Sequence, residues 1–354
     1  MKIGIITFHC GDNYGAVLQA FALFHKMQEL FTSADVFIVD YRPIYIKKMF
    51  SLFRNRNIFY FINSILQLPF SLMIKYHFNH FRKKHYKYIS IHNTGSLDFI
   101  VCGSDQIWNP LITKGLDDHY FGFFDGFSGK AVAYAASDGG NIEKDGDSNK
   151  IERYLNNLSA ISVREKSMIP IIQKYHKNGI ASIDPVFLPG VSFWTRNAQK
   201  QKFQNYILVY RVLPNDTILR DAEQIAKQTN KHIIEIRFGI PYKNLFSIKH
   251  TVLPVVSIPD FLSLFLYADF VLTNSFHGTA FSVIFNKQFC SYKINDSISS
   301  RITDLLSDIE LTERYVECSV ETITKKIDYQ TVNEKIKQKC LSANSYILES
   351  LGKS

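Results

Sequence analysis

The chain has 354 residues, of which 46% are hydrophobic and 21% are charged, and its formal net charge is +9. A chain of this length is longer than one hydrophobic core usually supports, so we expect two domains. The composition is typical of a globular protein and excludes a disordered chain. The five cysteines are far apart and form no C-x-x-C pair, which argues against a disulfide framework and against a zinc site.

The first forty residues predict a strand, a helix and a second strand. Lys2 to Phe8 and Val36 to Asp40 are short apolar runs, and Ala16 to Phe31 has apolar residues on most helical faces. The loop Cys10-Gly11-Asp12-Asn13-Tyr14-Gly15 then lies at the carboxyl end of the first strand. The N-terminus has the pattern of a strand rather than of a signal peptide, so we expect a cytoplasmic protein.

Residues 42–97 contain no Asp or Glu but ten Lys or Arg residues, and they are rich in Phe, Tyr, Ile and Leu. Basic residues around an aromatic and apolar stretch are typical of helices that lie on an anionic membrane surface. The apolar part, residues 58–74, is broken by Asn63, Gln67 and Pro69 and is short for a bilayer crossing. The alternatives are a solvated helical insertion and a nucleic-acid surface, but no nucleic-acid motif accompanies the charge. We therefore expect a peripheral protein at the inner face of the cell membrane that binds no nucleic acid.

Three short buried strands are predicted after the basic segment: Phe99 to Cys102, Ala131 to Ala136 and Ala160 to Val163. Each ends in polar or small residues, and ligands of an open parallel sheet bind outside the carboxyl ends of its strands. Residues 184–204 interrupt the periodicity with prolines, a glycine and a polar stretch, which indicates a linker between domains.

A second α/β series follows the linker. The fold class that we predict is α/β, with two doubly wound, Rossmann-like domains over residues 1–190 and 205–354 that face each other across a cleft. The elements expected in the second domain are strands at Tyr206 to Val212, His232 to Ile236, Phe270 to Thr273 and Gln288 to Tyr292, helices at Thr217 to Thr229, Asp260 to Ala268 and Thr279 to Phe285, and a final amphipathic helix over residues 330–351.

His277 lies between the strand that ends at Thr273 and the helix expected from Thr279. The start of a helix offers N–H groups and a positive dipole end, so this turn is suited to an anion such as a phosphate or a carboxylate. Ser275 and Thr279 can add hydroxyl donors, and Gly278 lets the backbone approach a ligand closely. The alternative is that His277 only forms hydrogen bonds within the turn.

Six short blocks of this sequence, taken in their order, resemble the polysaccharide pyruvyl transferase family from Lys2 to about Leu306. Each block alone is a weak signal, and the ordered set is specific. The blocks are GDNYGAVLQAFAL, VCGSDQIWNP, YAAS, SVRE, DPVFLP and TNSFHGTAFSVIFNKQF.

The resemblance implies a fold similar to that of two-domain, GT-B type glycosyltransferases. Members of the family are bacterial enzymes that transfer the enolpyruvyl unit of phosphoenolpyruvate onto two hydroxyls of a sugar, which forms a cyclic ketal and releases phosphate during capsule or exopolysaccharide synthesis. The family's acid/base histidine matches His277, and an arginine that binds the donor anion matches Arg164. Some members carry an arginine where this chain has Ser275, so Arg164, Arg211 or Arg301 must supply that charge here.

On this interpretation the first domain binds the sugar acceptor, which is lipid-linked or nucleotide-linked. Asp105 follows a strand and can hold or deprotonate sugar hydroxyls, and Trp108 can offer a flat face to a pyranose ring. The alternatives are that Asp105 and Asn13 cap helices and that Trp108 fills the core. The residues expected at the acceptor are Asn13, Tyr14, Gln19, Asp105, Gln106 and Trp108; those expected at the donor are Arg164, Arg211, Ser275, Gly278, Thr279 and Arg301, with His277 as the catalytic group.

No cofactor and no metal are expected, because phosphoenolpyruvate serves as the donor substrate. Asp145-Gly146-Asp147 resembles the D-x-D metal signature of some glycosyltransferases, but no strand leads into it and we expect a surface loop. Two other functions stay open: a glycosyltransferase of similar fold that uses a nucleotide sugar, and a catalytically silent sugar-binding relative.

Overall fold

The computed structural model describes residues 1–51, 58–145, 147–175, 178–237, 250–293 and 296–352. The chain forms two compact units, each of which is described by itself. The first unit comprises Met1–Phe50, Arg82–Pro189 and Glu334–Ser354, and the second comprises Ser51–Phe81 and Gly190–Asn333.

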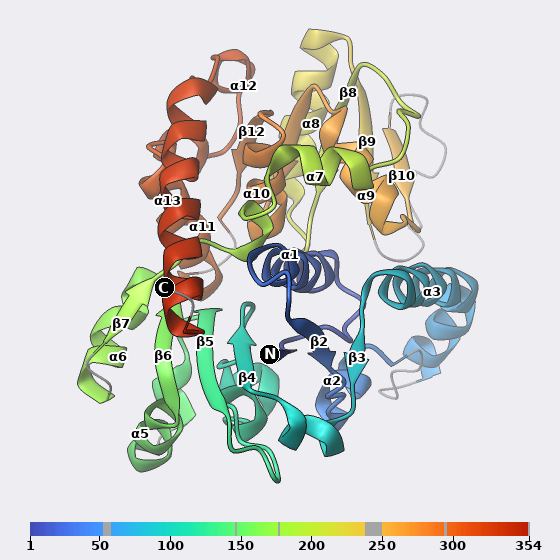
Figure 1. The fold of residues 1–354 in the computed structure, drawn as a ribbon. Coiled ribbons are helices and arrows are strands. Elements are labelled where there is room, and N and C mark those ends of the chain that lie inside the picture. Colours follow the sequence, from blue (N-terminus) through green and yellow to red (C-terminus); the bar gives the residue numbers. More distant parts are fainter. Residues whose placement is uncertain (52–57, 146, 176–177, 238–249, 294–295, 353–354) are drawn as a thin grey trace. The chain divides into compact units, whose positions relative to one another are not determined.

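The first unit is built on a sheet of seven parallel strands in the order β3-β2-β1-β4-β5-β6-β7 (Figure 1). Its central strands are apolar on both faces, as strands covered by helices on both sides must be. The strands are β1 (Lys2–Ile6), β2 (Asp35–Val39), β3 (Tyr88–Ile89), β4 (Phe99–Gly103), β5 (Lys130–Ala136), β6 (Leu158–Val163) and β7 (Gly179–Ala181).

The longest helices of the N-terminal half are α1 (Tyr14–Leu30) and α3 (Ile58–His85). Asn13 begins α1, because its side-chain oxygen accepts a hydrogen bond of 3.1 Å from the Ala16 N–H. The shorter helices are α2 (Ile44–Met49), α4 (Pro110–Thr113), α5 (Ser148–Asn156) and α6 (Ile169–Tyr175). No helix among the described residues has both the length and the hydropathy that a bilayer crossing needs.

The second unit contains a sheet of five parallel strands in the order β10-β9-β8-β11-β12 (Figure 1). These are β8 (Tyr206–Tyr210), β9 (His232–Ile236), β10 (His250–Leu253), β11 (Phe270–Thr273) and β12 (Gln288–Ser291). Its helices are α3 as far as Phe81, α7 (Gly190–Asn197), α8 (Asp216–Thr229), α9 (Ile258–Leu266), α10 (Phe276–Ile284), α11 (Asp296–Asp308), α12 (Val320–Thr324) and the first residues of α13 (Tyr329–Ser350).

The predicted strands and helices are confirmed with small shifts of their ends, and the two α/β series are confirmed as two parallel sheets. Two differences concern the boundary between the series. The expected linker over residues 184–204 contains helix α7, and the second unit begins at Gly190 inside that range.

The expected division into residues 1–190 and 205–354 also differs at two further segments. Most of α13 groups with the first unit, where the Tyr346 hydroxyl donates to the Ala133 carbonyl at 2.8 Å and Cys340 lies 3.6 Å from the Phe187 carbonyl. Residues 51–81, taken from the basic segment, group with the second unit. Both segments group with the unit other than the expected one because of contacts between residues far apart in sequence. The hydrophobic periodicity of a sequence does not predict such contacts.

Cys290 at β12 and Cys318 form a disulfide. The sequence argument against bonded cysteines is therefore wrong for this pair, because 28 residues separate two cysteines that parallel packing brings together. Cys10, Cys102 and Cys340 are not bonded.

Candidate active site

The second sheet has its topological switch point between β8 and β11, the position at which doubly wound sheets bind ligands. Asn274, which directly follows β11, ties the two strand ends together. Its side-chain oxygen accepts from the Val212 N–H at 2.9 Å, and its side-chain nitrogen donates to the Leu213 carbonyl at 2.9 Å. The segment that leads into α10 is thus held in one position.

His277 lies in the first turn of α10 and is 7% exposed. The helix starts at Phe276, three residues earlier than predicted, so His277 is part of the helix rather than of the turn before it. Ser275 occupies the N-cap position, but its side chain makes no capping hydrogen bond; its hydroxyl bonds instead with the Tyr210 hydroxyl. The first N–H groups of a helix have no intrahelical acceptor, so this end of α10 is suited to an anion.

Gly278 and Thr279 serve the packing of α10. A Cβ at Gly278 would come closer than 3.0 Å to the Thr273 hydroxyl oxygen. The Thr279 hydroxyl lies 3.1 Å from the Ser275 carbonyl and 2.7 Å from the Ser291 hydroxyl, and its residue is 0% exposed. Thr279, predicted to contact the donor, therefore joins α10 to β12.

Arg211, which follows β8, is engaged by a buried carboxylate. Its guanidinium donates to Glu235 in β9 through Nε at 3.1 Å and also through Nη2, while Nη1 donates to the Asn215 carbonyl at 3.0 Å. His250 contacts the other Glu235 oxygen at 3.1 Å. Burial raises the pKa of Glu235, but the hydrogen bonds from His250 and Arg211 more than offset it and lower that pKa. Arg211 thus compensates Glu235.

Arg301 on α11 is the predicted arginine that the structure places at the start of α10. Its guanidinium carbon lies 5.8 Å from the centroid of the Phe276 ring, and that ring packs edge-on against His277 with 5.2 Å between centroids. Among the three candidates for the missing charge, Arg301 is therefore the one that contacts the first turn of α10, at the residue before His277.

The first sheet has its switch point between β1 and β4. Thr7 after β1 donates from its hydroxyl to the Ser104 carbonyl after β4 at 2.9 Å. The next residue, Asp105, has φ = 68°, a left-handed conformation that non-glycine residues rarely adopt and that is common at functional positions. Its side chain is 15% exposed, so this carboxylate reaches the surface at the switch point.

Arg164 follows β6 and is buried among acceptors that follow two other strands, β4 and β7. Its guanidinium lies 3.0 Å from Asp184, 3.2 Å from the Ser104 hydroxyl and 4.0 Å from Asp105. The Asp184 side chain is 0% exposed and that of Arg164 is 3% exposed, so the pair is internal. Next to it, the Ser137 hydroxyl donates to Glu165 at 2.5 Å. Arg164 thus holds the strand ends together and compensates Asp184.

The structure contradicts the prediction that Trp108 offers a face to a sugar. Trp108 is 0% exposed, its ring nitrogen donates to the Tyr120 carbonyl at 3.0 Å, and it stacks on Phe121 with ring centroids 4.9 Å apart. An indole in such a position belongs to the core, which is the alternative that the sequence left open.

The loop after β1 supplies capping and core residues. Asn13 caps α1, Tyr14 is 1% exposed, and Gln19 is fully buried with its amide donating to the Thr7 hydroxyl at 2.8 Å. Gln106 is partly exposed and lies against Gly139, where its amide nitrogen leaves no room for a side chain. Of the six predicted acceptor residues, Asp105 and Gln106 are those placed at the switch point with polar atoms near the surface.

Sequence reasoning missed several polar residues that complete these sites. Glu235 stands in the otherwise apolar strand HIIEI, and a charge inside a buried strand is a usable signal of a partner. His9, after β1, is 0% exposed and lies 3.4 Å from Asp40. Burial lowers the pKa of His9, and the hydrogen bond with His9 lowers the pKa of Asp40 to about 2. Asp184, Ser104 and His250 carried no local signal.

Two acidic clusters have structural roles. Asp147 of the D-x-D sequence caps α5 by accepting from the Lys150 N–H at 2.9 Å. Within the described part of the chain, Asp117, Asp118 and His119 bring possible metal ligands within 4.8 Å. Asp117 already accepts hydrogen bonds from the Tyr41 hydroxyl at 2.7 Å and the Tyr45 hydroxyl at 2.5 Å. This cluster therefore closes an internal network.

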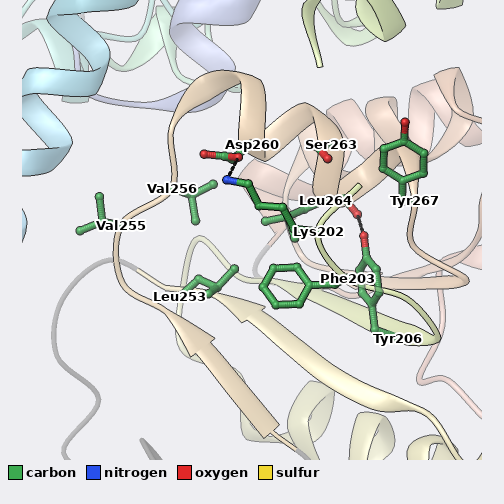
Figure 2. A pocket seen from close by; sticks show the side chains of 10 residues that line it. All are labelled: Lys202, Phe203, Tyr206, Leu253, Val255, Val256, Asp260, Ser263, Leu264 and Tyr267. Atoms are coloured by element: carbon green, nitrogen blue, oxygen red, sulfur yellow. Dashed lines mark hydrogen bonds and ion pairs between the residues drawn. The ribbon is translucent and has the colours of Figure 1, made fainter. Parts of the chain in front are cut away.

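A pocket of about 150 Å³ lies beside α9, away from His277 in the chain fold, and none of the predicted site residues lines it. Figure 2 shows the Phe203 ring in the middle of its lining, with the Lys202 ammonium and the Asp260 carboxylate paired at 2.6 Å. Its walls are mostly apolar and its two charged groups pair with each other, so we do not take it as the site of the chemistry. It is lined by Lys202, Phe203, Tyr206, Leu253, Val255, Val256, Asp260, Ser263, Leu264 and Tyr267.

The sequence profile of polysaccharide pyruvyl transferases matches residues 13–296, which is most of the chain and includes Asp105, Arg164 and His277. The chain belongs to the polysaccharide pyruvyl transferase family. It is accordingly a transferase of polysaccharide synthesis. A comparison with curated proteins finds no match.

Solved structures of similar fold are GT-B glycosyltransferases and epimerases. The UDP-GlcNAc 2-epimerase of Neisseria meningitidis bound to UDP-GlcNAc gives a TM-score of 0.52 at 11% identity, over 100% of both chains. Arabidopsis thaliana UGT89C1 gives 0.53 at 11% identity, over 99% of both chains. The S. aureus MnaA-UDP co-structure gives 0.52 at 11% identity, over 98% of this chain and 91% of that one. At these identities the likeness concerns the fold alone, and it confirms the GT-B class.

Proposed function

We propose that the protein moves the enolpyruvyl unit of phosphoenolpyruvate onto two hydroxyls of one sugar during the synthesis of a surface polysaccharide. The C2–O bond to phosphate breaks and two C–O bonds form at C2, so the product is a cyclic ketal of pyruvate. The two hydroxyls lose their protons; one proton reaches the methylene carbon, which becomes a methyl group, and the other leaves with phosphate. The observation that carries the proposal is the position of His277 at the switch point of the second sheet, in a chain of this family.

His277 is the proposed acid/base group. An imidazole gives and takes protons near neutral pH, so one residue can protonate the methylene carbon and later accept the proton of a sugar hydroxyl. Its place in the first turn of α10 puts it beside N–H groups that suit the phosphate of the donor. The neighbouring helix end also disfavours an imidazolium unless an anion is bound, which couples its protonation to donor binding.

The donor carries a carboxylate and a phosphate, so the site needs a cation in addition to backbone N–H groups. Arg164 and Arg211 compensate the buried carboxylates of Asp184 and Glu235. Arg301 lies over the ring of Phe276, the residue before His277 in the first turn of α10. We therefore assign the charge that other members carry at the position of Ser275 to Arg301.

Asp105 is the residue that we assign to the acceptor. It lies at the switch point of the first sheet with a partly exposed carboxylate. A carboxylate there can accept hydrogen bonds from the two sugar hydroxyls and help remove a proton from one of them.

Binding of the donor is the first test. We expect phosphoenolpyruvate to raise the melting temperature with a concentration dependence that follows its dissociation constant, while inorganic phosphate at equal concentration gives a smaller shift. The Arg301→Ala variant should lose that response, and Arg220→Ala, an exposed arginine on α8, should keep it. A wild-type protein that phosphoenolpyruvate does not stabilise, with or without sugar present, contradicts the proposed donor.

A nucleotide-sugar glycosyltransferase is the second candidate, because the similar folds include structures with bound UDP-GlcNAc or UDP. Stabilisation by UDP that exceeds stabilisation by phosphoenolpyruvate favours that candidate. Stabilisation by sugar alone, with neither donor active, favours the catalytically silent relative.

A further inference from the structure

Helix α3 presents an apolar surface to solvent. Among the α3 side chains that the structure describes, four large apolar ones are about half exposed or more: Ile65 at 47%, Leu72 at 50%, Met73 at 52% and Tyr76 at 65%. On its opposite side, Ile74, Phe78 and Phe81 are buried, at 8%, 0% and 4%. The helix is therefore apolar on both sides, and only one of them is covered by the protein.

The exposed apolar residues lie on one side of the helix. Ile65, Leu72 and Tyr76 are seven and four residues apart, the intervals that place side chains above one another on a helix. Met73 flanks them, and the exposed Pro69 fills the gap between Ile65 and Leu72. We call the set Ile65, Leu72, Met73 and Tyr76 the α3 stripe.

The α3 stripe ends in positive charge. Lys83 is seven residues after Tyr76 and so continues the same side, and Lys84 adjoins it; both are exposed. Arg82 points inward instead, donating to the Gly11 carbonyl at 2.6 Å and pairing with Asp12 at 2.8 Å. Thus Arg82 anchors the helix, and the two lysines remain at its surface.

No acidic residue of the same segment balances this surface, because residues 42–97 contain ten Lys or Arg residues and no Asp or Glu. The surface of a partner protein of ordinary composition carries both positive and negative side chains, so it would not complement a stripe whose only nearby charges are positive. A bilayer with anionic headgroups matches both properties at once, since apolar side chains insert at the headgroup boundary and lysines remain among the phosphates.

We propose that the α3 stripe, with Lys83 and Lys84, docks the protein on an anionic bilayer surface. The helix lies along the surface with its covered side, at Ile74, Phe78 and Phe81, attached to the protein. The purpose of this docking rests on the proposed function: it keeps the enzyme at the membrane, where lipid-linked sugar acceptors are held. The docking itself needs neither the donor nor the acceptor.

The test is co-sedimentation with vesicles of phosphatidylglycerol and phosphatidylcholine, compared with vesicles of phosphatidylcholine alone. We expect binding to the anionic vesicles that weakens at high salt. Leu72→Ser/Met73→Ser/Tyr76→Ser and, separately, Lys83→Glu/Lys84→Glu should each lower that binding about tenfold or more. The melting temperature of each variant shows whether it is folded.

Matched controls change the same chemistry elsewhere. Leu111→Ser/Val191→Ser/Leu341→Ser alters three other exposed apolar residues, and Lys325→Glu/Lys326→Glu alters an exposed lysine pair outside the segment. These controls should bind anionic vesicles as the wild type does. Equal losses of vesicle binding in the controls would overturn the proposal. So would wild-type binding that is the same with and without phosphatidylglycerol in the vesicles.

A second copy of the chain is the competing occupant. If light scattering shows a dimer that the stripe variant dissociates while vesicle binding is unchanged, the stripe joins two copies and the membrane proposal is wrong. Phosphoenolpyruvate stabilisation of the same variants is measured in parallel. The variants should keep that stabilisation while they lose vesicle binding. A wild-type protein that binds anionic vesicles but is not stabilised by phosphoenolpyruvate refutes the proposed donor alone, and one that is stabilised but does not bind the vesicles refutes the docking alone.

Discussion

Gly278 packs so tightly on Thr273 that a Cβ at Gly278 would lie closer than 3.0 Å to the threonine hydroxyl oxygen. Thr273 cannot move away freely, because this hydroxyl donates to the Tyr210 carbonyl at 2.7 Å and accepts from the Ser275 N–H at 3.1 Å. The first turn of α10, which carries His277, is thereby fixed against β11.

We expect Gly278→Ala to lower the free energy of unfolding by about 1–3 kcal/mol, because the added methyl must displace this turn. Urea unfolding measures the loss, and kcat should fall as well because His277 moves. The same substitution in a Thr273→Ala background should cost less, with Thr273→Ala alone as the reference. An equal cost in both backgrounds would show that the strain does not come from this contact.

Replacing His277 tests the acid/base role. We expect His277→Ala to lower kcat for acceptor-dependent phosphate release by about 10²–10⁴-fold, because both proton transfers lose their group. His232→Ala, an exposed histidine at the start of β9, is the matched control and should keep wild-type activity. If His277→Ala remains folded and loses less than about tenfold, this residue is not the general acid/base.

Arg301 is expected to bind the donor and not to hold the fold together. Arg301→Ala should raise the KM for phosphoenolpyruvate about tenfold or more, because a charge-assisted contact to an anion is lost. Steady-state kinetics against donor concentration give this value, and Arg220→Ala provides the control. An unchanged KM in Arg301→Ala would mean that Arg164 or Arg211, and not Arg301, supplies the charge that other members carry at the position of Ser275.

Because Arg164 and Asp184 form a buried ion pair, we expect the losses in free energy of unfolding on replacing each of them to be strongly non-additive. Arg164→Ala should lower the free energy of unfolding by about 3–5 kcal/mol, because it leaves the Asp184 carboxylate buried without its cation. Arg164→Ala/Asp184→Ala should recover part of that loss, as a double-mutant cycle in urea would show. The double variant should also keep stabilisation by phosphoenolpyruvate; its loss would make Arg164 a donor ligand.

The stability of the protein should depend on His119 above neutral pH. Burial lowers the pKa of His119, but Asp117 and Asp118 more than offset this and raise it above 6.5. Its contribution is therefore fully present below about pH 6.5 and is lost as the pH rises through the raised pKa. Urea unfolding between pH 6 and 9 should show a decline that His119→Gln reduces and that His92→Gln, an exposed control, does not. The same decline in His119→Gln would assign it to other groups.

Local patterns predicted most elements and the position of His277 just after β11. The apolar run Phe270–Thr273 and the small residues after it predicted β11, and the loop at Asn13 predicted the start of α1. Each of these features depends on neighbours within a few residues, so composition and spacing report them. The start of α10 was misplaced by three residues, because Phe276, His277 and Gly278, which have the composition of a turn, already belong to the helix.

The sequence by itself determined two α/β series and the family, and it singled out His277 as the residue that we propose as the acid/base group. Only the tertiary structure showed that Arg164 and Arg211 are compensated, by Asp184 in the segment after β7 and by Glu235 in β9. It also placed Trp108 in the core and left the α3 stripe uncovered. Burial and ion pairing depend on which strand ends and helix faces pack together. These contacts join residues far apart in the chain, so they produce no periodic pattern or fixed spacing in the sequence.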